Sequence, residues 1–152
     1  MTPPPARMSL ESAAREEIDR ALVASGWLVQ DLAAINLYAG PGVGVCEVPL
    51  APGHGVADYL LYADGQAVGV VEAKKVGQTL TGVEIQSEKY GAGLPAGVPA
   101  PVRPLPFLYQ STGVETRFTN RLDPVPKSRD VFAFHRLERW PRGRLPEKSC
   151  CL

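Results

Sequence analysis

The segment from Asp58 to Lys74 constrains the fold more than any other part of the chain. It consists of two short apolar runs, 58–63 and 66–74, on either side of Asp64-Gly65. Asp-Gly between apolar runs is a strong local signal for a β-hairpin. The sequence therefore predicts two antiparallel strands joined by a tight turn at residues 64–65.

Three charged residues gather at the open end of this hairpin. Side chains alternate between the two faces of a strand, so Glu72 and Lys74 point the same way and Ala73 the opposite way. Pairing across the hairpin brings Asp58 alongside them. Two carboxylates and an ammonium group at one strand end could hold a divalent metal ion and a scissile phosphate. This arrangement predicts a metal-dependent nuclease.

Length and composition are those of an ordinary globular domain. The chain has 152 residues, of which 45% are hydrophobic and 21% charged, enough for one domain with a real core. No apolar run approaches the roughly 20 residues of a membrane span, and the start at residues 1–5 has no signal-peptide character. We therefore expect a cytoplasmic protein with no membrane segment.

Cysteines and histidines show no spacing typical of a zinc site. Cys46 stands alone, Cys150 and Cys151 are adjacent, and His54 and His135 are the only histidines. A metal in this chain is therefore expected to be a hard ion bound by carboxylate oxygen, magnesium or manganese.

The net charge of zero hides an uneven distribution. Residues 1–102 contain 6 Lys or Arg and 11 Asp or Glu, whereas residues 103–152 contain 10 and 5. A mixed, solvated surface in each half would account for this distribution. So would an acidic half that holds metal and a basic half that meets phosphate, and the sequence leaves both open.

An amphipathic helix is expected over residues 9–25, with Ser9 as N-cap and Gly26 in the helix-stop position. Glu11 falls inside its apolar stripe, where burying a bare carboxylate is costly. Glu11 either pairs with Arg15 one turn later or faces the metal site from this helix.

The rest of the chain predicts further strands and a second helix. These elements are a strand at 43–50, a helix at 80–92, and strands at 107–112, 114–119 and 131–136. Glu47 in the first of them is either a further acidic contributor or a solvent-facing residue, and we favour the second. The order of elements indicates an α/β protein with a mixed sheet flanked by helices.

An acidic residue on one strand followed by Glu-x-Lys on the next resembles the PD-(D/E)xK nuclease superfamily. Asp58 is the first acid, and Glu72 and Lys74 form the second part of the pattern. Ala57 stands where that pattern has proline, a position that the superfamily holds loosely.

The resemblance extends from about residue 9 to about 140 and becomes more specific. Residues 57–61 and 70–74 are similar to the two catalytic strands in the N-terminal nuclease domain of type I restriction enzyme R (HsdR) subunits. The stretch 11–27 resembles their entry helix, and Gln86-x-x-x-Tyr90 resembles their QxxxY element, although these two residues alone would suit an ordinary helix surface.

The resemblance implies a restriction-endonuclease-like core and a set of site residues. Asp58, Glu72 and Lys74 would be catalytic. Mg²⁺, with Mn²⁺ as a substitute, would be bound by Asp58, Glu72, the carbonyl of Ala73 and Glu11. Lys74 would orient the attacking water or stabilise the developing negative charge.

The resemblance also implies partners. Gln86 and Tyr90 would contact double-stranded DNA, while methylation and specificity subunits and a helicase domain would belong to the full system. Residues 1–8 are expected to be a disordered lead, 9–140 the nuclease domain and 141–152 an irregular tail. No GxxxxGK[ST] motif occurs, so no ATP site or helicase domain is expected in this chain.

Two alternatives to an active nuclease stay open. The chain could be a truncated R-subunit remnant that binds DNA or a partner subunit without cleaving. The charges at the strand end could also form only an exposed ion-pair cluster, which would bind no metal.

Overall fold

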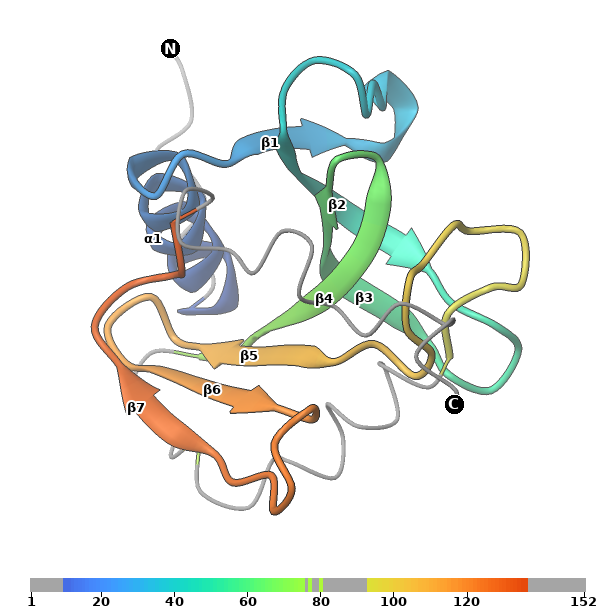
Figure 1. Cartoon of the computed structure of the whole chain (residues 1–152). Helices are drawn as coiled ribbons and strands as arrows, with labels where there is room; N and C mark the ends of the chain where they lie inside the picture. Colours follow the sequence, from blue (N-terminus) through green and yellow to red (C-terminus); the bar gives the residue numbers. More distant parts are fainter. Residues whose placement is uncertain (1–9, 76, 78–79, 81–92, 137–152) are drawn as a thin grey trace, which may run out of the picture.

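The computed structural model describes residues 10–75, 77, 80 and 93–136, without the side chains of residues 10 and 11. Seven strands form one mixed sheet in this part of the chain (Figure 1). The strands are β1 (Leu28–Asp31), β2 (Gly42–Pro49), β3 (Val56–Ala63), β4 (Gln66–Ala73), β5 (Phe107–Ser111), β6 (Thr116–Asn120) and β7 (Arg129–Val131). They lie side by side in chain order. The pairs β1–β2 and β4–β5 are parallel and all other neighbours are antiparallel, which confirms the predicted mixed sheet.

The predicted hairpin is confirmed as β3 and β4. Asp64 and Gly65 connect them with φ angles of 50° and 81°. Positive φ at both central residues is the signature of a type I′ turn, whose twist matches that of paired strands. Tyr59 pairs with Val71 near the open end of the hairpin, so the register places the start of β3 beside the end of β4.

Helix α1 (Leu10–Ala24) covers one face of the sheet (Figure 1). Ile18 and Leu22 are fully buried on its apolar stripe and belong to the same core cluster as Tyr59. The helix ends where predicted, because Gly26 adopts a φ of 94° that favours glycine. The expected N-cap, residue 9, lies outside the described residues. No helix in the described part of the chain has the length and apolar character that crossing a bilayer requires.

The opposite face of the sheet is also buried. Leu60 and Val70 from the hairpin pack there with Leu105 and Leu108 in a second core cluster. The predicted helix at 80–92 lies outside the described residues except for Leu80, which is fully buried. Burial on both faces explains why β3 and β4 are nearly continuous apolar runs rather than alternating ones.

Two predictions of secondary structure need correction. The expected strand at 131–136 is wrong, because β7 is the last strand up to residue 136, where the described part ends, and only Val131 is shared with the prediction. The backbone of His135 instead contacts the sheet through β5, since its N–H donates a hydrogen bond to the Tyr109 hydroxyl at 3.2 Å. Its carbonyl oxygen accepts a hydrogen bond from Trp27 Nε1 at 3.0 Å. The sequence also missed β1 and the short 3₁₀ helix η1 (Leu32–Ala34) that follows it, because a four-residue, half-exposed strand carries little periodic signal.

Candidate active site

Glu72 and Lys74 lie at the end of β4 and interact directly. Lys74 Nζ lies 2.7 Å from Glu72 Oε1, and the side chains of Lys74 and Glu72 are 16% and 2% exposed. This contact confirms that the two residues point the same way, as strand alternation requires. Glu72 pairs in register with Gln110 of the parallel strand β5, whose side chain is also buried. A polar layer therefore continues across two central strands at this end of the sheet.

Asp58 at the start of β3 reaches the same strand end. Its Oδ2 accepts a hydrogen bond from the backbone N–H of Ala73 at 2.9 Å. Ala73 stands between Glu72 and Lys74, so this bond anchors the Asp58 carboxylate against the middle of the Glu-x-Lys segment. The structure thus brings together the three residues that the sequence predicted to be catalytic.

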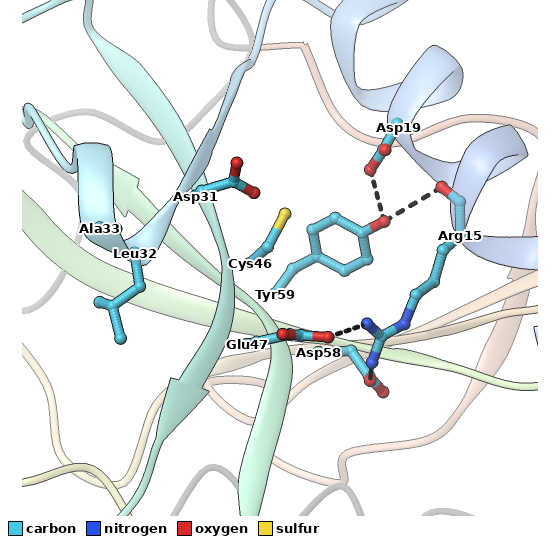
Figure 2. A pocket seen from close by; sticks show the side chains of 9 residues that line it. All are labelled: Arg15, Asp19, Asp31, Leu32, Ala33, Cys46, Glu47, Asp58 and Tyr59. Atoms are coloured by element: carbon cyan, nitrogen blue, oxygen red, sulfur yellow. Dashed lines mark hydrogen bonds and ion pairs between the residues drawn. The ribbon is translucent and has the colours of Figure 1, made fainter. Parts of the chain in front are cut away.

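Arg15 of α1 also binds Asp58, and the sequence did not predict this contact. Its Nη2 donates to Asp58 Oδ1, and its Nη1 donates to Glu47 Oε1 at 2.5 Å. Figure 2 shows the guanidinium lying between the two carboxylates. The sequence offered Glu11 as a helical partner of Arg15, but the side chain of Glu11 lies outside the described part. The sequence did place Arg15 beside the apolar stripe of the helix, which indicates that it lies near the sheet. Which carboxylates it contacts depends on how the helix packs on the sheet.

Glu47 owes its position to an irregularity in β2. Cys46 pairs with Tyr59 and Val48 pairs with Ala57, so Glu47 lies opposite Asp58 across the two strands. Its φ is 53°, an unusual left-handed conformation within a strand. The side chain is 65% exposed, consistent with the solvent-facing position favoured from the sequence. Through its ion pair with Arg15 it nevertheless joins Asp58 in one charged cluster, which consists of Glu47, Asp58 and the Arg15 guanidinium between them.

A pocket of about 610 Å³ opens beside this cluster. Its lining combines one arginine, four carboxylates, a thiol and a phenol with two apolar residues: Arg15, Asp19, Asp31, Leu32, Ala33, Cys46, Glu47, Asp58 and Tyr59 (Figure 2). Asp58 is the one residue shared between this lining and the predicted catalytic trio. The predicted site therefore borders the pocket through the Asp58 carboxylate.

Hydrogen bonds fix the helix to the strand along this pocket. The Tyr59 hydroxyl donates to Asp19 Oδ1 at 2.5 Å and lies 3.1 Å from the carbonyl oxygen of Arg15 (Figure 2). Both acceptors belong to α1, one turn apart. The turn of α1 that carries Arg15 is therefore held against β3 independently of the ion pair.

The pocket changes the ionisation of its groups. Burial raises the pKa of the Tyr59 hydroxyl, and the hydrogen bond and negative charge of Asp19 raise it further. Burial, together with the charges of Asp19 and Asp31, raises the pKa of the Cys46 thiol to about 11. Burial acts to lower the pKa of Arg15, but the carboxylates of Glu47 and Asp58 outweigh it and the pKa is raised. Arg15 is therefore a permanent positive charge, while Cys46 and Tyr59 are neutral near pH 7.

The donors around Asp58 suit a hard cation in chemical type. Carboxylate oxygens from Asp58 and Glu72 are the ligands that Mg²⁺ and Mn²⁺ prefer, and Mg²⁺ is commonly bound by one or two carboxylates with water completing the shell. Among the described residues, no group of three or more His, Cys, Asp or Glu side chains is placed to hold a metal. The described chain therefore offers two of the predicted carboxylate ligands, Asp58 and Glu72, and each already faces a basic side chain.

Three predicted site residues cannot be placed. Gln86 and Tyr90 lie outside the described residues, and Glu11 is described only as part of the first turn of α1. Their predicted contacts with metal and DNA stay predictions.

One family model matches the chain. Residues 38–100 match the model described as "Type I restriction enzyme EcoKI endonuclease subunit second domain". The match runs from the loop before β2 past β4 and includes Asp58, Glu72, Lys74, Gln86 and Tyr90, but not the α1 residues. No curated protein and no solved structure matches the chain. The match covers somewhat under half of the 152 residues and relates this segment to the endonuclease (HsdR) subunit of type I restriction enzymes.

Proposed function

We propose that this chain is a metal-dependent endodeoxyribonuclease domain of a type I restriction system, with a restriction-endonuclease-like core of the PD-(D/E)xK kind. The observation that carries the proposal is the convergence of Asp58, Glu72 and Lys74 at one strand end. All three lie in the segment that matches the restriction-subunit model. Two carboxylates beside an ammonium group match the chemistry of phosphodiester hydrolysis better than that of a solvated surface, since Glu72 is almost completely buried.

Each residue has a role that its position supports. The carboxylates of Asp58 and Glu72 would bind Mg²⁺, with the carbonyl of Ala73 and Glu11 as further ligands. Mg²⁺, when bound, supplies a Lewis acid that stabilises negative charge on the phosphate oxygens. The Lys74 ammonium would hold the attacking water or stabilise the charge that develops on the phosphate. The amide of Ala73 orients Asp58 for this work through the 2.9 Å hydrogen bond.

The partners follow from the same relation. Double-stranded DNA would be the substrate, and Gln86 and Tyr90 would contact its backbone. Sequence recognition, methylation and translocation would be supplied by other subunits or domains of the system. The alternative, a domain that binds DNA or a subunit without cleaving, differs from this proposal in one measurable property, which is hydrolysis.

Asp58→Asn and Glu72→Gln are the variants that test the proposal, and Asp64→Asn is the matched control. The control makes the same chemical change at the turn end of the same hairpin, where asparagine tolerates the positive φ. Calorimetric titration with Mn²⁺ and cleavage of supercoiled plasmid would be measured on each protein after circular dichroism confirms the fold. We expect Mn²⁺ binding and cleavage in the wild type and the control, and loss of both in the two site variants.

The outcomes separate the candidate functions. Cleavage by Glu72→Gln at the wild-type rate would refute the proposed site. Mn²⁺ binding that depends on Asp58, with DNA binding but no cleavage by the wild type, would favour the non-cleaving alternative. Absence of Mn²⁺ binding in a folded wild type would favour a simple ion-pair cluster.

A further inference from the structure

A positive side chain already lies between Asp58 of the proposed site and the neighbouring carboxylate of Glu47. Arg15 bridges Glu47 and Asp58, which face each other across β2 and β3. Asp58 is also the residue that borders the pocket. Asp58 Oδ2 already accepts the backbone N–H of Ala73, so a divalent cation would compete for Oδ1, to which Arg15 Nη2 now donates.

Arg15 is held there incompletely. Its Nε atom is buried and has no hydrogen-bond partner among the described residues. A buried N–H without an acceptor carries a desolvation cost that a solvated one does not. This helical turn is fixed separately, since the Tyr59 hydroxyl donates to Asp19 Oδ1 at 2.5 Å and lies 3.1 Å from the Arg15 carbonyl oxygen. The side chain can consequently leave Asp58 without moving α1 away from the sheet.

We propose that Arg15 is a resident counter-ion of the Glu47–Asp58 pair that competes with the divalent cation for Asp58. This inference rests on the proposed function, because it takes the cation to be the metal of that site. In the metal-free protein the guanidinium neutralises two facing carboxylates that would otherwise repel each other. Metal binding releases Asp58 from Arg15 and leaves the guanidinium on Glu47 at the edge of the pocket. Arg15 thus sets the metal concentration at which the site fills.

The competition is tested by Mn²⁺ binding rather than by cleavage. Arg15→Gln removes the competing charge, and Arg15→Lys keeps a charge but cannot bridge two carboxylates with one planar group. Arg20→Gln is the matched control, since Arg20 lies on the same helix and pairs with Glu17 on the exposed side. Affinity would be measured calorimetrically, and thermal unfolding would be followed with EDTA and with Mn²⁺.

We expect Arg15→Gln to bind Mn²⁺ at least about tenfold more tightly than the wild type, the equivalent of about 1.4 kcal/mol. The Mn²⁺ affinity of Arg15→Lys should lie between those of the wild type and Arg15→Gln, and the affinity of Arg20→Gln should equal that of the wild type. In EDTA, Arg15→Gln should unfold at a lower temperature than the wild type because Glu47 and Asp58 repel each other, and Mn²⁺ should restore more of its stability.

Unchanged or weaker Mn²⁺ binding in folded Arg15→Gln would overturn the competition. If Arg15→Gln does not fold, unchanged or weaker binding in Arg15→Lys would overturn it equally. The failure of the proposed function is distinguishable. Tighter binding in Arg15→Gln together with no plasmid cleavage by any protein would support the competition and refute the nuclease. Cleavage that depends on Asp58, with Mn²⁺ affinities of Arg15→Gln and Arg15→Lys equal to that of the wild type, would support the nuclease and refute the competition.

Discussion

The buried ion pair between Glu72 and Lys74 makes a quantitative prediction about stability. Replacing Lys74 by methionine keeps the aliphatic stem and removes the ammonium that lies 2.7 Å from Glu72. Removing one partner of a buried ion pair typically costs roughly 3–5 kcal/mol, because the remaining charge stays buried. Lys74 is 16% exposed, so water can reach the vacated position, and we expect the lower end, about 3 kcal/mol.

Equilibrium urea unfolding in EDTA measures this cost. With an m value of about 2 kcal/mol/M, a loss of about 3 kcal/mol lowers the urea midpoint by about 1.5 M. The control is Lys75→Met, which makes the same change at the next residue, where the side chain is exposed. It should change the free energy of unfolding by less than about 0.5 kcal/mol.

A double-mutant cycle isolates the pair itself. In a Glu72→Gln background the side chain at position 72 carries no charge, so Lys74→Met should cost at least about 2 kcal/mol less than in the wild type. Equal costs in the two backgrounds, or equal effects of the Lys74 and Lys75 substitutions, would refute the argument that Glu72 depends on Lys74 for its burial.

Two further predictions concern packing and pH. A Cβ at Gly69 would lie 2.6 Å from the backbone oxygen of Phe107 on β5, so Gly69→Ala should lower the free energy of unfolding by about 2–3 kcal/mol, measured in urea. Gly97→Ala is the control and should have little effect, because no atom lies within 4 Å of a Cβ there. Equal effects of the two substitutions would show that β4 and β5 are not packed this closely. Cys46 has a pKa raised to about 11 in the folded protein from 9.0, so the unfolded chain ionises first and stability should fall as pH rises from about 9 to about 11. Cys46→Ala should show a smaller fall over that interval in urea midpoints, and an equal slope would contradict the raised pKa.

Local signals in the sequence were sufficient for the hairpin and for the three residues at its open end. Asp64-Gly65 specifies its turn through backbone preferences that do not depend on the rest of the chain. Once the turn is fixed, strand alternation places Glu72 and Lys74 on one face and brings Asp58 to the same end. The end of α1 at Gly26 follows from an equally local preference for a left-handed residue.

Tertiary structure alone decided which charges meet around Asp58. Arg15 and Asp58 are 43 residues apart, and Arg15 and Glu47 are 32 apart, so no helical or strand period relates them. Their contact depends on how α1 packs on the sheet and on the irregular backbone at Glu47. The sequence determined the hairpin and its acidic end because these rest on near-neighbour geometry. The identity of the counter-ion at the acidic end of the hairpin, Arg15, was decided by the packing of α1 against the strands. Local sequence does not distinguish among the many ways in which long charged side chains could pair there.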